Sequence, residues 1–432
     1  MTMGHSVRST FAPVAVLALA AAPACGPRGV DPPVDPSEDP PVVCSASQGA
    51  SAAALSLAGD DTSFALALFP PAAAAVGAGQ NVILSPYGVS AVLSMLDVGA
   101  AGETATQIES ALSLPGSGAA VAPAYASLAC ADESDGSSNG NQLSIANALW
   151  GQQGTPFQAS FLSTLARGYS APLQQADFVH DAGGATNDIN QWVSTETEGA
   201  IPTLFQPGQL DASTRLVLVN AVYFKGTWAT GFDPDATAPL PFTLEGGSQV
   251  PVPTMDGTMT LSQGTGNGFE VVEVPYKGGA MAIDILLPSG GSLATLEASL
   301  TPAALQAALA SLATTKDVEL FLPRFSFSTR LVLNPVLTGL GMSDVFRADR
   351  ANLSGVDGAQ DLSVSVVVQQ AMIEVDEQGT VAAAATGVGV ITAVAQTPSA
   401  VHVDHPFLFV LRDTRTGSVL FMGHVEDPRA GS

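Results

Sequence analysis

The stretch EVDEQGTVAAAAT at residues 374–386 opens the segment that decides the fold. From Gln378 to Val403 the chain has no Asp, Glu, Lys or Arg. Every second residue from Thr380 to Thr392 is Thr, Ala or Val. Since neither face of such a strand carries a charge, the segment can enter the middle of a sheet without desolvating an ion. The pattern is typical of a loop that later becomes a strand.

Two other interpretations of residues 378–403 stay open on composition. The segment is long enough for a transmembrane helix, but its glycines, Gln396 and Pro398 disfavour one. It is too long for a single ordinary strand, because strands usually have about 3 to 10 residues, although a strand followed by a loop fits. The composition therefore leaves a membrane helix, a strand with a loop, and a segment that changes state.

The 432 residues hold 14 Lys and Arg against 39 Asp and Glu, for a net charge of -25. This balance excludes nucleic acid and glycosaminoglycans as partners, because polyanions are bound by basic surfaces. The three cysteines lack the CxxC spacing of metal or redox sites. HExxH, GxSxG and phosphate-loop motifs are also absent from the sequence. We therefore expect no metal, no cofactor and no enzymatic activity.

A hydrophobic content of 46% supports a large core. Helical patterns dominate the first third of the chain, where Ser85-Pro86 is a helix start signal, and apolar strand patterns follow. The polar cluster at residues 132–141 predicts a surface loop. Together the patterns predict a mixed α+β fold in one domain at residues 52–432.

The N-terminus predicts export. Residues 1–24 have the charge and apolar run of a signal peptide, and Cys25 follows small residues as in bacterial lipoproteins. Residues 25–51 form a proline-rich tether. We expect a cell-surface or outer-membrane lipoprotein that contacts the membrane only through its lipid, with simple secretion as the alternative. The sequence leaves two states open for Cys44 and Cys130: a disulfide between them or two free thiols.

Several ordered blocks stand out between about residue 60 and Pro428. They are NVILSP at 81–86, VNAVYFKGTW at 219–228, EVPYKG at 273–278, the opening stretch at 374–386, and HPF at 405–407. Together these blocks resemble the serpin family. The resemblance implies an α+β fold with three β-sheets, about nine helices and an exposed reactive loop from about Gly379 to Ser399, in a monomer.

The resemblance also implies a function, that of a suicide-substrate inhibitor of serine proteases, with papain-like cysteine proteases as a further class of target. In this family the protease cleaves the reactive loop, which then inserts into the main sheet and traps the acyl-enzyme. One alternative is a non-inhibitory serpin-fold protein with a binding or chaperone-like role. Another is an unrelated surface lipoprotein whose uncharged segment anchors or oligomerises.

The resemblance assigns the loop residues by position. Spacing from Glu377 places the reactive bond at Ala393-Val394, with Thr392 and Ala395 as alternates. All of these are small and uncharged, which implies an elastase-like or subtilisin-like target. The hinge that inserts first comprises Glu377, Gly379, Thr380, Ala382, Ala383, Ala384, Ala385 and Thr386.

The resemblance further implies three residues that control sheet opening. Asn220 matches the buried polar residue at the centre of the main sheet. The usual partner histidine is Gln369 here, and a neighbouring serine is Gly88. Trp228 matches the tryptophan at the end of the sheet where insertion begins, although an ordinary core tryptophan is the alternative. Residues 125–130 hold no Lys or Arg, so glycosaminoglycan activation is not expected.

Overall fold

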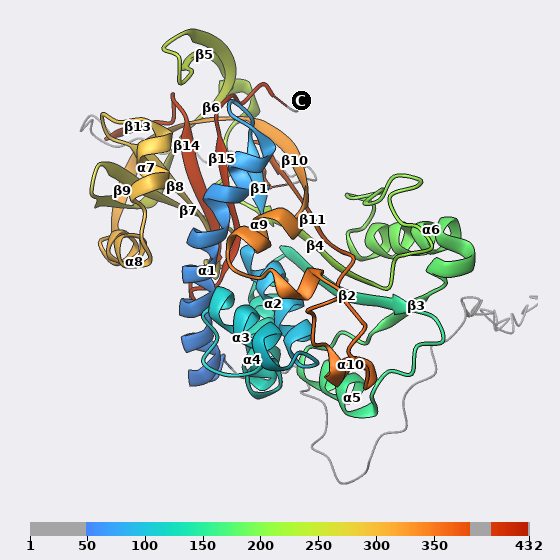
Figure 1. Ribbon diagram of the computed structural model, residues 1–432. Coiled ribbons are helices and arrows are strands. Elements are labelled where there is room, and N and C mark those ends of the chain that lie inside the picture. Colours follow the sequence, from blue (N-terminus) through green and yellow to red (C-terminus); the bar gives the residue numbers. More distant parts are fainter. Residues whose placement is uncertain (1–48, 381–398, 431–432) are drawn as a thin grey trace, which may run out of the picture. The chain divides into compact units, whose positions relative to one another are not determined.

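The structure is a computed structural model that describes residues 49–380 and 399–430, all of which belong to one compact unit. The predicted signal peptide, Cys25, Cys44 and most of the predicted reactive loop lie outside these residues. Helices pack around two hydrogen-bonded β-sheets (Figure 1). Cys130 is disulfide-bonded, which excludes the free-thiol alternative; its expected partner Cys44 lies outside the described ranges.

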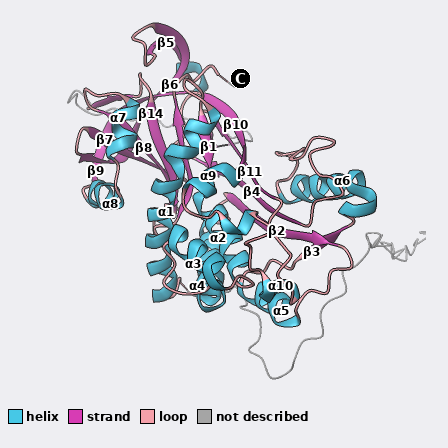
Figure 2. Cartoon of the chain, in the orientation of Figure 1, coloured by secondary structure: helices cyan, strands magenta, loops and turns pink. Residues whose placement is uncertain are grey.

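The six-stranded sheet positions the candidate site. Its central strand β4 is buried on both faces, which explains its nearly continuous apolar sequence. Helix α6 (Phe178–Glu196) covers one face (Figure 2). Its Ile189 and Val193 belong to the same buried apolar cluster as Val217 and Val219 of β4. The strand order is β10 (Phe325–Val332), β11 (Val366–Val375), β12 (Gly379–Thr380), β4 (Leu216–Thr227), β2 (Gln142–Gln152) and β3 (Gln174–Ala176).

The remaining strands form a nine-stranded sheet, so the described residues contain two sheets where three were expected. The reason is strand β6, whose 18 residues run without a break and pair with β5, β7 and β9. The order is β1 (Val82–Leu84), β15 (Val419–Val425), β14 (Phe407–Asp413), β8 (Met281–Pro288), β7 (Phe269–Pro275), β6 (Gln249–Gly266), β9 (Ala313–Pro323) and β13 (Ala400–His402), with β5 (Ala238–Thr243) on β6.

Ten α-helices occur in the described residues, close to the expected nine, and the last has only four residues. Ser85 caps α2 and Pro86 is its first residue, as predicted. The helices are α1 (Ala52–Val76), α2 (Pro86–Asp97), α3 (Gly102–Leu112), α4 (Gly118–Gly136), α5 (Ala159–Gly168), α6 (Phe178–Glu196), α7 (Leu293–Ser299), α8 (Pro302–Ala310), α9 (Asn334–Gly339) and α10 (Ser354–Asp357).

Helix α1 is long and apolar enough to cross a membrane by length and composition alone. Half of its most apolar window is buried inside the protein, however, and Phe64, Leu68 and Phe69 are part of the main core. Its apolar character is thus accounted for by packing, and we interpret it as a core helix.

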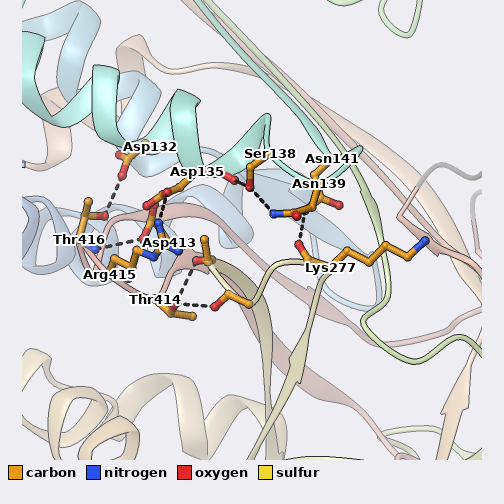
Figure 3. A network of polar contacts seen from close by, with 12 residues as sticks. Asp132, Asp135, Ser138, Asn139, Asn141, Lys277, Asp413, Thr414, Arg415 and Thr416 are labelled. Atoms are coloured by element: carbon orange, nitrogen blue, oxygen red, sulfur yellow. Dashed lines mark hydrogen bonds and ion pairs between the residues drawn. The ribbon is translucent and has the colours of Figure 1, made fainter. Parts of the chain in front are cut away.

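The surface loop predicted at residues 132–141 was wrong in its first half. Helix α4 continues to Gly136, and Asp132 is fully buried. These acidic residues have tertiary partners in the turn between β14 and β15: Thr416 donates to Asp132 at 2.7 Å, and Arg415 forms an ion pair with Asp135 (Figure 3). A polar composition could not reveal partners so distant in the sequence.

Candidate functional site

The candidate site begins where the predicted hinge enters the six-stranded sheet. Strand β12 lies between β11 and β4 and is antiparallel to both. Thr380 pairs with Val375 on one side and Gly226 on the other, and Gly379 pairs with Thr227. Gly379 and Thr380, near the start of the uncharged segment, thus already occupy a central strand position.

Asp376 forms the turn that reverses the chain into this position. Its carboxylate accepts hydrogen bonds from the backbone amides of Gln378 at 2.8 Å and Gly379 at 3.1 Å. Its own amide donates to the Gly379 carbonyl at 2.9 Å. Such an Asp side chain stabilises a tight turn locally, so the chain leaves β11 and returns antiparallel to it.

Gly379 is required at its position by close backbone contact. Its φ is +151°, and a Cβ built on it would lie 1.9 Å from the carbonyl oxygen of Gly226. No side chain fits there unless the two strands separate. The glycine of the predicted hinge therefore allows β12 to approach β4 closely.

Trp228 lies beside Asp376 and Gln378, next to the predicted hinge. Its indole Nε1 donates to the Asp376 carbonyl at 2.9 Å, and its amide donates to the Gln378 carbonyl at 2.9 Å. The indole stacks on Tyr276 with ring centroids 4.6 Å apart, and the Tyr276 hydroxyl is 2.6 Å from the hydroxyl of Thr380. Trp228 is buried, and these contacts distinguish it from a purely apolar core tryptophan.

Glu377 attaches the hinge to neighbouring elements. Its side chain is 6% exposed and accepts hydrogen bonds from Thr237 and from the guanidinium of Arg324, which is 43% exposed. Burial raises the pKa of Glu377, but the bonds from Thr237 and Arg324 outweigh this effect and hold the pKa below its usual value. The Phe232 amide also donates to the Glu377 carbonyl at 2.8 Å.

A chain of three amide side chains crosses the centre of the sheet, and we call it the polar chain. Asn220 of β4 donates to Asn147 of β2 at 2.8 Å, and Gln369 of β11 donates to Asn220 at 2.6 Å. Gln369 also donates to the Ser85 carbonyl at 2.7 Å. The glutamine thus makes the contact with Asn220 that the family's histidine was expected to make. The polar chain links β2, β4 and β11 where β4 and β11 are direct neighbours.

Gly88 leaves the space that Asn220 occupies. A Cβ at residue 88 would lie 2.1 Å from the Asn220 Nδ2. The departures from the family pattern at 88 and 369 are therefore related: with glutamine at 369, the Asn220 side chain fills the volume that a residue larger than glycine would need.

Beyond the hinge, β4 and β11 pair directly. Val366 to Ala371 pair in parallel with Val217 to Val222. An entering strand can first face residues 372–374 of β11 and 223–225 of β4, which do not pair with each other, but to go further it must separate these six pairs. The entering strand replaces one parallel ladder by two antiparallel ladders, which are slightly more stable per residue.

The loop returns to the described structure at Ser399. Strand β13 pairs in parallel with β9 of the nine-stranded sheet, and the ring of His402 stacks on Phe321 with centroids 4.4 Å apart. The chain before the loop therefore ends in the six-stranded sheet, and the chain after the loop begins in the nine-stranded sheet. The predicted residues Ala382, Ala383, Ala384, Ala385 and Thr386 and the reactive-bond candidates Thr392, Ala393, Val394 and Ala395 lie outside the described residues.

The sequence reasoning missed three contributors to the site: Arg324, Tyr276 and Asn147. Asn147 had a signal in the sequence, because it stands between the apolar residues IA and ALW of β2. Arg324 and Tyr276 had none beyond their place in strand-rich blocks, because their roles depend on which strand ends meet.

Comparisons with known proteins found similar sequences and structures. Residues 60–428 match the family described as Serpin (serine protease inhibitor). A human leukocyte elastase inhibitor is 35% identical over 86% of this chain and 99% of its own length, and an uncharacterized serpin-like protein of Methanosarcina acetivorans is 32% identical over 81% of this chain and 82% of its own length. Native protease nexin-1, solved with heparin, superposes with a TM-score of 0.78 at 29% identity, covering 87% of this chain and all of that one.

Proposed function

The chain belongs to the serpin family, and we propose that it is a suicide-substrate inhibitor of serine endopeptidases with elastase-like or subtilisin-like specificity. The observation that supports this most is the position of Gly379 and Thr380 between β11 and β4. In the proposed reaction the protease serine attacks the scissile carbonyl and forms an acyl-enzyme with the loop. Cleavage frees the segment on the N-terminal side of the cut. This segment then inserts from Thr380 onward, before water hydrolyses the acyl bond to the protease.

The register of β12 gives the extent of insertion. If the antiparallel pairing of Thr380 with Val375 and Gly226 continues, residue 389 reaches the far ends of both neighbours, opposite Val366 and Val217. The reactive bond at Ala393-Val394 lies only four residues beyond. A protease attached at Ala393 would therefore be carried along the whole length of the sheet.

If the strand continued in the same register, Thr386 would lie opposite both Asn220 and Gln369. Facing residues of neighbouring strands project to the same side of a sheet. The threonine hydroxyl would thus enter at the level of the polar chain, where it supplies a donor and an acceptor when the Asn220–Gln369 bond breaks. A polar residue at this level avoids leaving buried amides unpaired.

The target class follows from the loop and from a relative. The residues proposed around the reactive bond are small and uncharged, so they suit a protease pocket without a buried counter-ion. A 35% identical relative is named leukocyte elastase inhibitor. We also propose export, either as a lipoprotein modified at Cys25 or as a secreted protein; the disulfide at Cys130 supports an oxidising compartment.

Incubation with pancreatic elastase and with subtilisin tests the proposal. We expect an SDS-resistant complex of inhibitor and protease. Thr380→Arg should abolish the complex and leave only cleaved chain, because Thr380 is 2% exposed and an arginine there would bury a charge. Ser328→Arg is the matched control, since Ser328 is exposed on β10 of the same sheet. Cleavage of the wild type without any complex would refute inhibition and favour the non-inhibitory alternative.

A further inference from the structure

Residues 201–210, which we call the crossing segment, belong to the connection between α6 and β4. The buried apolar side chains of this segment are in one cluster with side chains of α6, β4 and β11. A polar side chain of α6 holds the segment from one side, and a polar side chain of β10 holds it from the other. The buried apolar residues of the segment are Ile201, Leu204, Phe205 and Leu210.

Asn190 holds the crossing segment to α6. Its Oδ1 accepts hydrogen bonds from the amides of Leu204 at 2.9 Å and Phe205 at 2.8 Å. Its Nδ2 donates to the Phe205 carbonyl at 2.8 Å. Because α6 contacts β2, which follows β4 in the strand order, this anchor belongs to the β2 side of the sheet.

Arg330 of β10 holds the same segment from the opposite side. Its Nε donates to the Leu204 carbonyl, and its Nη2 donates to the Oε1 of Gln209 at 3.0 Å. The guanidinium carbon also lies 5.6 Å from the centre of the Phe205 ring, which is within the range of a cation–π contact. One arginine thus contacts three residues of the crossing segment.

The two anchors lie on opposite sides of the boundary between β4 and β11. Strand β10 is next to β11, whereas β2 is next to β4. Arg330 is opposite Gln370 of β11, and Gln370 is opposite Ala221 of β4. Facing residues project to the same side of a sheet, and Ala221 is in the cluster of α6, so Arg330 projects to the α6 side. The crossing segment therefore spans the boundary that an inserting loop would have to open.

An inserted strand would pull the two anchors apart. Neighbouring strands are about 4.8 Å apart, so a new strand between β4 and β11 would move β10 away from β2 by about that distance. Hydrogen bonds do not survive such a displacement, so one anchor has to break. Asn190 makes three hydrogen bonds to the segment and Arg330 makes two. The Arg330 anchor should therefore break first.

We propose that Arg330 is a positioning residue that straps the crossing segment over the closed sheet and has to release it before the loop inserts fully. This inference rests on the proposed function, because it assigns a barrier to the same insertion. If the pairing of β12 continued, residue 385 would reach the level of Arg330, so the strap opposes the later part of insertion and not the entry of the hinge. Arginine suits this role because its planar head group donates to two acceptors at once.

Hydrogen exchange of the native protein tests the strap without any protease. Arg330→Met should raise the exchange rate of the amides of residues 204–210 by about tenfold, because hydrogen bonds from charged donors are the stronger ones. Arg330→Lys should give an intermediate rate, since an ammonium group keeps the charge but lacks the two-pronged geometry. Arg429→Met is the matched control: Arg429 donates through the same two nitrogens to Asp427, two residues away, and its loss should leave this exchange unchanged.

The link to insertion is tested with elastase at saturating amounts of the chain. Arg330→Met should raise the limiting rate at which elastase activity is lost by about threefold to tenfold. Removal of an arginine that only stabilises the fold would not speed trapping. Unchanged exchange in the crossing segment would overturn the strap, and raised exchange with an unchanged or slower rate would overturn its role in insertion. A wild type that is cleaved without trapping elastase would instead refute the proposed function, and the exchange result alone would then decide the strap.

Discussion

Removal of the Arg324 guanidinium should weaken the attachment of the hinge. In Arg324→Met, Glu377 keeps its hydrogen bond from Thr237 but loses the cation beside a carboxylate that is only 6% exposed. Loss of one partner of a fully buried pair costs about 3 to 5 kcal/mol. Because Arg324 is 43% exposed and water can replace part of the interaction, we expect a smaller loss, about 2 kcal/mol.

The pKa of Glu377 gives this prediction a second, independent signature. Its folded-state pKa lies below the usual value of 4.5, so the stabilisation is present above pH 4.5 and is lost as the pH falls through the folded-state pKa. The difference between wild type and Arg324→Met should therefore be full at pH 7 and shrink below pH 4.5, as Glu377 becomes protonated in the folded state.

The assay is thermal unfolding followed by circular dichroism at several pH values. A loss of about 2 kcal/mol should lower Tm by a few degrees at pH 7. Arg347→Met is the matched control: Arg347 pairs with Asp349 at the surface, with side chains 52% and 69% exposed, so it should change Tm little. An unchanged Tm in Arg324→Met, or a difference that does not shrink as the pH falls below 4.5, would refute the reasoning.

Three further predictions concern the core and the sheet. Unfolding stability should fall as the pH rises from about 4 to 7, because burial raises the pKa of several carboxyls and the folded state then binds more protons than the unfolded state; a Tm that is constant or rises over this range would contradict it. Those carboxyls are Asp97, Asp284 and Asp413, each at about 6, and Asp61 at about 7. Gly88→Ser should displace Asn220 and cost about 1 to 3 kcal/mol in urea unfolding, with partial recovery in combination with Gln369→His; unchanged stability would show that the site has spare room. Gly379→Ala should keep the hinge out of the sheet, since its Cβ would collide with Gly226, and should raise the amount of inhibitor cleaved per complex with elastase; unaltered stoichiometry would show that early entry is unimportant.

The sequence was most informative where the site residues follow one another closely along the chain. Glu377, Gly379 and Thr380 stand in one short stretch, and the structure places all three at the end of the sheet beside Trp228. Asn220 was singled out by its match to the family pattern, and in β4 it also interrupts the apolar run from Leu216 to Val222.

Contacts made by side chains from separate elements could not be derived. Arg324 reaches Glu377 across 53 residues, and Asp132 is buried by Thr416 across 284. Both depend on which strand ends and turns meet, which hydropathy does not encode. The number of sheets also differed from expectation. Strand β6 is one long strand, and composition alone could not distinguish it from two shorter strands.

The close approach of Gly379 to Gly226 bears on how often a cleaved molecule would trap the protease and how often it would be released by hydrolysis. In the proposed mechanism, hydrolysis of the acyl bond competes with insertion of the loop into the sheet. Because the first two residues of β12 are already in register, insertion would need only to extend an existing strand. The close approach of Gly379 to the Gly226 carbonyl would thus influence the yield of trapped protease more than the affinity for it.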